Sequence, residues 1–87
     1  MVMSEFDLED TIRELVAAIE GTVCSRSRVV DALLDLRLDA AARRDVVELV
    51  DVALATIPGK NMVSTDWWRE QLEMFELIAI NPVEPVA

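Results

Sequence analysis

Histidine and tyrosine are absent from the chain, cysteine occurs once and glycine twice. Without histidine the chain lacks the usual proton shuttle and the commonest metal ligand. The single cysteine can form neither a zinc site of thiolates nor a disulfide within the chain. Two isolated glycines cannot build a glycine-rich loop around a phosphate group. These absences predict a protein with no bound metal and no cofactor.

The remaining chemistry gives no support to catalysis. Cys24 has no histidine to activate it as a nucleophile, and Lys60, the only lysine, stands in a turn with no favoured serine beside it. The carboxylates have no spacing that resembles a calcium-binding loop, and many fall on the polar faces of helical segments, where solvation explains them. These are Glu9, Asp10, Glu14, Asp45, Glu48 and Asp51. We therefore expect a non-enzymatic protein.

Acidic residues outnumber basic ones by 17 to 8, which gives a net charge of −9. This charge opposes general binding to nucleic acid, because such binding neutralises phosphates with lysine and arginine. The first ten residues lack the basic and apolar regions of a signal peptide, and charges interrupt every apolar stretch well before the roughly 18 residues that a membrane span needs. We expect a cytoplasmic protein with no contact to membranes.

Apolar residues make up 53% of the chain and recur at helical spacing. The pattern predicts an all-α fold, a single-domain compact bundle of about four short helices, with no strand-like alternation and no repeat at a solenoid period. The domain is expected to span residues 1–80, and residues 81–87 to form an extended tail after Pro82. Caps and breakers, including Ser4, Asp39 and the Pro58–Gly59 turn, place the helices near 5–20, 25–36, 39–57 and 64–80.

The fourth helical segment carries the widest apolar arc, roughly 160° of the helix. This arc is wider than one packing partner usually requires, and tryptophan, methionine and phenylalanine are enriched at protein interfaces. We predict that part of it meets another protein chain, while the rest packs in the core or against a neighbouring helix. The candidate interface residues are Trp67, Met74, Ile78, Trp68 and Phe75.

Two arginines, Arg37 and Arg43, fall inside apolar arcs when their segments are projected as ideal helices. Both lie near helix ends, so their long side chains can reach solvent. The alternative is a half-buried, charge-assisted pair with a carboxylate from another helix or chain.

A second reading concerns the sequence Ser-Arg-Ser-Arg at positions 25–28, which begins a helix after another helix and a short turn that contains Gly21. This order loosely fits a helix-turn-helix motif, in which Arg26 and Arg28 would contact nucleic acid. The net charge and the apolar character of the helix both oppose this interpretation.

The sequence therefore predicts a small acidic protein-interaction module that self-associates, docks on a protein partner, or both. The first alternative is the helix-turn-helix regulator. The second is an acidic inhibitor that occupies a basic surface of another protein through Asp45, Glu48 and Asp51. The partner other than the chain itself is not identified by the sequence.

Overall fold

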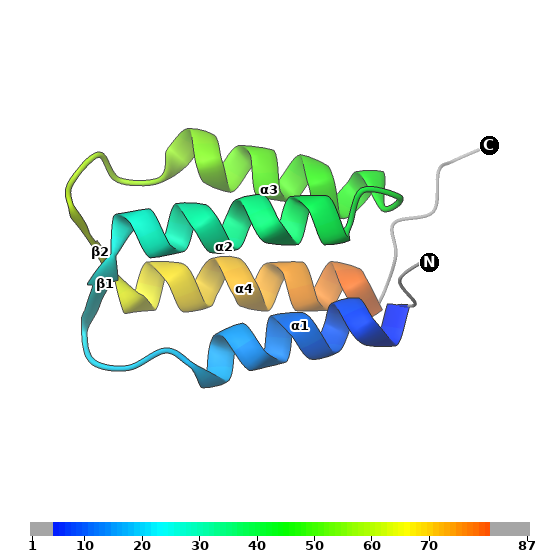
Figure 1. Cartoon of the computed structure of the whole chain (residues 1–87), viewed down its shortest axis with the longest axis horizontal. Coiled ribbons are helices and arrows are strands. Elements are labelled where there is room, and N and C mark those ends of the chain that lie inside the picture. The colour runs from blue at the N-terminus through cyan, green and yellow to red at the C-terminus, as the bar shows by residue number, and fades with distance from the viewer. Residues whose placement is uncertain (1–4, 81–87) are drawn as a thin grey trace.

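Four helices and two short strands form the part of the chain, residues 5–80, that a computed structural model describes. Their order is α1 (Glu5–Ala17), β1 (Val23–Ser25), α2 (Arg26–Asp39), α3 (Arg44–Thr56), β2 (Met62–Ser64) and α4 (Thr65–Ile80) (Figure 1). The prediction of a small, compact helical domain is confirmed. The predicted cap at Ser4 and the predicted tail at 81–87 lie outside the described residues. Between residues 5 and 80, no helix has the length and apolar character to cross a membrane.

The two strands were not predicted, and they join the two halves of the chain. They pair antiparallel, with Cys24 opposite Val63 at the centre. Beyond the strand ends, the Arg26 amide donates to the Asn61 carbonyl at 2.9 Å and the Thr65 amide donates to the Thr22 carbonyl at 3.0 Å. Strands of three residues are too short to show an alternating pattern in the sequence.

The element order is a repeat, because each half of the chain is a helix, a strand and a second helix. We call residues 5–39 the first unit and residues 44–80 the second unit. The buried positions of α4 lie 39 residues after those of α2 and its C-cap: Val29 and Trp68, Leu33 and Leu72, Leu36 and Phe75, Ala40 and Ala79. Between α1 and α3 the offset is 38 residues, as in Leu8 and Val46 or Ile12 and Val50. This repeat of two units was not predicted from the sequence.

The helix boundaries differ from the predicted ones at the junction between the units. Asp39 is the last residue of α2 rather than the cap of α3, because the Ala40 amide continues the helical pattern by donating to the Leu36 carbonyl at 2.9 Å. Residues 40–43 form the connecting turn, and α3 begins at Arg44. The first helix ends at Ala17 rather than near residue 20, and Gly21, with a φ of 71°, lies in the loop that follows.

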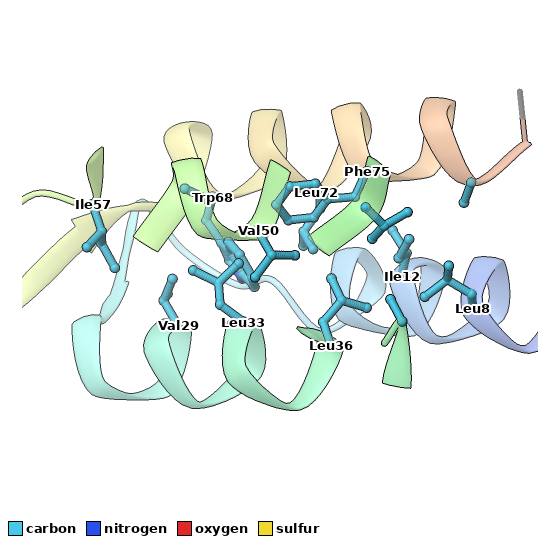
Figure 2. Close-up of a cluster of buried hydrophobic side chains, with 14 of the residues drawn as sticks. Leu8, Ile12, Val29, Leu33, Leu36, Val50, Ile57, Trp68, Leu72 and Phe75 are labelled. Atoms are coloured by element: carbon cyan, nitrogen blue, oxygen red, sulfur yellow. The ribbon is translucent and has the colours of Figure 1, made fainter. Parts of the chain in front are cut away.

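The helices form a ring in which α1 lies against α4, α4 against α3, and α3 against α2. The closing side of the ring, between α1 and α2, has the least contact of the four. In Figure 1, α2 and α4 accordingly lie between α3 and α1. Side chains from all four helices meet in one core, where Leu33, Val50, Leu72 and Phe75 have no exposed surface (Figure 2).

Candidate functional site

The five predicted interface residues of α4 divide into two groups. Trp68 and Phe75 belong to the core of the chain, with 6% and 0% of their surface exposed, and Figure 2 shows both side chains within the buried cluster. They are too deeply packed to contribute to a free surface, so these two residues are removed from the candidate interface. Trp67 and Ile78 are half-buried and Met74 is 40% exposed, which leaves these three on one edge of α4.

Helix α3 extends this edge into a larger apolar surface. Leu49, Val52 and Ile78 line a shallow groove of about 310 Å³ together with Asp45 and Glu48. Val52 is 57% exposed. Together with the α4 edge these residues form what we call the α3/α4 surface: Leu49, Val52, Trp67, Met74 and Ile78. The wide apolar arcs of both helical segments favoured self-association, but the interface residues predicted from the sequence all lie on α4, and none was named on α3.

Arg43 connects the two helices that form this surface. Its Nε and Nη2 atoms donate to the two carboxylate oxygens of Asp45 at 3.1 and 3.0 Å, and Nη2 also donates to the Ile78 carbonyl at 2.9 Å. The bond to Ile78 satisfies a carbonyl in the last turn of α4, where a helix leaves such groups without internal partners. Arg43 is therefore half-buried and charge-paired, as the alternative interpretation held, but its carboxylate partner stands beside it on α3.

Arg37 makes the exposed counterpart of this interaction. Its Nε atom donates to Asp51 Oδ1 at 2.8 Å and so joins α2 to α3 at the surface. The hydrogen bond and the charge of Asp51 raise the pKa of Arg37, which stays protonated. The Arg37 side chain therefore reaches solvent, as its position near a helix end predicted. It also pairs with a carboxylate of another helix, as the alternative interpretation predicted.

The two arginines of the possible nucleic-acid site do not act together. The Arg26 side chain donates through Nε to the Pro58 carbonyl at 2.9 Å and so holds the loop of the second unit. Arg28 is exposed at the start of α2. The connection between α1 and α2 contains strand β1 rather than the short turn of a helix-turn-helix motif.

The acidic residues of the third interpretation are mostly paired within the chain. Asp45 is paired with Arg43, and Asp51 with Arg37. Glu48 lines the α3/α4 groove together with Asp45. Two of the three carboxylates therefore already have cationic partners within the chain. Across residues 5–80, no cluster of three acidic or cysteine side chains is arranged to hold a metal ion.

A second, larger groove lies between α1 and α2 next to the strands, with a volume of about 490 Å³. We call it the α1/α2 groove, and we define it by Leu15, Ile19, Val23, Arg28 and Ala32. Cys24 also lines it, and its thiol donates to the Val63 carbonyl with an Sγ to oxygen distance of 3.5 Å. Burial raises the pKa of the Cys24 thiol. No feature of the sequence pointed to this groove.

Comparisons of the chain with protein-family models, with curated proteins and with solved structures each give no match. The functional interpretation therefore depends on the two surfaces described above.

Proposed function

We propose that the chain is a non-enzymatic protein-interaction module that self-associates through the α3/α4 surface. The observation that carries this proposal is the groove lined by Leu49, Val52 and Ile78, with Val52 exposed and with the exposed Met74 one helical turn before Ile78 on α4. Apolar side chains gathered on one face of a small soluble protein mark a surface that another chain covers. A domain of this size buries little more than about 60% of its unfolded surface, so a partner adds substantially to its stability.

The charge distribution favours a second copy of the chain at this surface. The whole chain carries a charge of −9, so two copies repel each other at long range. Leu49, Val52 and Ile78 line the groove of the α3/α4 surface together with Glu48 and with Asp45, which is paired with Arg43. Contact through this surface brings its apolar groups together. Added salt should therefore leave the association intact or strengthen it, whereas it would weaken binding to DNA or to a basic protein.

Sedimentation equilibrium tests the proposal with a pair of matched variants. Met74 on α4 and Asp35 on α2 occupy equivalent positions in the two units. Met74→Lys places a charge in the α3/α4 surface and should convert the assembly to a monomer, whereas Asp35→Lys should leave the mass unchanged. Both positions are exposed, so helical circular dichroism should be preserved in both variants. A wild-type chain that is a monomer at all accessible concentrations would contradict self-association.

A further inference from the structure

The two units carry side chains of different size at equivalent positions beside the α1/α2 groove. In the second unit, Trp67 and Trp68 follow strand β2; Trp68 is buried in the core and Trp67 packs against it. The equivalent residues of the first unit are Arg28 and Val29. Val29 is fully buried but is much smaller than tryptophan, and Arg28 is exposed. The first unit therefore lacks the aromatic side chains that would close the space between its two helices.

The packing of α1 keeps this space open. Helix α1 lies against α4, where Arg13 pairs with Glu76, and it has little contact with α2. The Trp68 side chain crosses from the second unit and forms part of the groove lining. Most of the other lining side chains are aliphatic, including Leu15, Ile19 and Ala32. The groove thus has an apolar interior suited to a large apolar side chain.

The helices on both sides of the groove carry acidic residues. On α1, Glu14 lies four residues before Ala18, which lines the groove. On α2, Asp35 and Asp39 lie three and seven residues after the lining residue Ala32, so they continue the same side of that helix away from the strands. All three are exposed. Within the lining itself, the charges of Glu20 and Arg28 balance.

We propose that the α1/α2 groove binds a basic amphipathic helix of a partner protein, which seats an apolar side chain in the groove and places lysine or arginine against the acidic helices. An amphipathic helix in an apolar groove is a recurrent mode of recognition, and its anchors are spaced along one helical face. The groove lies at the end of α1 and the beginning of α2, where its lining reaches from Arg28 to Ala32, so it seats about one to two turns of a partner helix.

Charge complementarity distinguishes this occupant from the others. A second copy of the chain carries the same charge of −9 and would bring further carboxylates to Glu14, Asp35 and Asp39. Nucleic acid and anionic lipid surfaces are repelled for the same reason. The groove and the α3/α4 surface lie on different helix pairs, so this inference is independent of the proposed self-association.

The binding experiment uses a synthetic peptide that is predicted to be helical, has leucines on one face and lysines on the other, and contains no tryptophan. Titration into the Trp67→Phe variant should change the emission of Trp68, which lines the groove. The affinity should fall as salt is added, because the lysines pair with exposed carboxylates. Two control peptides, one with the same composition in scrambled order and one with glutamate in place of lysine, should not bind.

Two sets of variants locate the binding. Ala32→Trp fills the groove and should weaken binding by at least about tenfold, while Ala55→Trp on the exposed side of α3 should change it by less than about twofold. Glu14→Gln combined with Asp35→Asn should weaken binding by about fivefold, whereas Glu70→Gln combined with Glu73→Gln on α4 should have a smaller effect. The surface charge variants decide the question even if Ala32→Trp fails to fold.

Three results would overturn the inference: no binding of the lysine peptide at low salt, equal binding of the glutamate peptide, or affinity unchanged by both groove variants. A loss of sedimentation mass in Ala32→Trp would also overturn it, because a second copy of the chain would then occupy the groove. Peptide binding measured in the monomeric Met74→Lys variant separates this inference from the proposed function. Binding retained in that variant supports the groove whether or not the wild-type chain self-associates.

Discussion

The two helix-strand-helix units bury equivalent positions but expose opposite chemistry. Val52, Met74 and Ile78 of the second unit correspond to Glu14, Asp35 and Asp39 of the first unit. These three positions are apolar in the second unit, where Val52 and Ile78 line the α3/α4 groove, and acidic in the first unit, where none of them lines the α1/α2 groove. The units pack into one shared core, so their inward residues must remain apolar, whereas their outward residues are free to differ. A repeat can therefore supply two distinct interaction surfaces from one architecture.

The largest difference between the units should appear when Trp68 and its equivalent, Val29, are truncated. Trp68→Ala should lower the free energy of unfolding by about 3–5 kcal/mol, and Val29→Ala by about 2 kcal/mol, because the tryptophan fills far more of the core. Urea unfolding followed by circular dichroism measures both losses. Equal losses of unfolding free energy would mean that Trp68 contributes no more to the core than Val29 does.

The second comparison sets the half-buried Arg43 against the exposed Arg37. Arg43→Gln should lower the free energy of unfolding by about 1–2 kcal/mol, because it removes charge-assisted bonds to Asp45 and the bond to the end of α4. Arg37→Gln should have a smaller effect that disappears at high salt, because exposed ion pairs are screened. The urea midpoints of the two variants at low and high salt give the result. A larger loss of stability in Arg37→Gln than in Arg43→Gln would contradict this comparison.

The third comparison concerns the side-chain hydrogen bonds to the two loops, for which a smaller difference in stability is expected. Thr65 and Arg26 occupy equivalent positions after the two strands, and each side chain donates to a carbonyl of the opposite loop. Thr65→Val should cost about 1 kcal/mol, since the bond to the Gly21 carbonyl at 2.8 Å comes from a buried side chain. Arg26→Ala removes an exposed bond and should cost less. Thermal unfolding of both variants shows which of them loses more stability. Arg28→Ala, which breaks no loop contact, is the control.

The smallest expected effect concerns Cys24, whose equivalent in the second unit is the fully buried Val63. Burial raises the pKa of the Cys24 thiol, and the thiolate is the reactive form. Alkylation by iodoacetamide should therefore reach half its maximal rate at a higher pH in the folded chain than in the urea-unfolded chain. A half-maximal rate at the same pH in both states would show that the groove leaves the thiol fully hydrated.

The fold class followed from the sequence because apolar residues repeat at helical spacing in all four segments. The junction at Asp39 was misassigned, since local capping preference cannot show that Ala40 continues the hydrogen bonds of α2 and is buried. The repeat was hidden because equivalent positions preserve burial rather than identity, as Val29 and Trp68 do. The division of the α4 arc into core and surface depends on where α3 and α1 pack, which periodicity within α4 does not specify.

The α1/α2 groove could not be predicted for a related reason. It lies where α1 packs against α4 and has little contact with α2, and its lining combines side chains from both units, including Trp68. Both depend on tertiary packing. The sequence placed Arg28 at the start of a helix and offered a nucleic-acid contact only as an alternative interpretation, and nothing in it indicated the neighbouring groove.

Amide correlation spectra of the wild-type chain, recorded as it is diluted from millimolar to low micromolar concentration, test most directly whether the second unit carries the self-association surface. Self-association through the α3/α4 surface predicts shifts confined to the amides on and around it, including Val52 and Met74, with the equivalent residues Glu14 and Asp35 unaffected. Shifts centred on α1 and α2, or spectra that do not change with concentration, would contradict it.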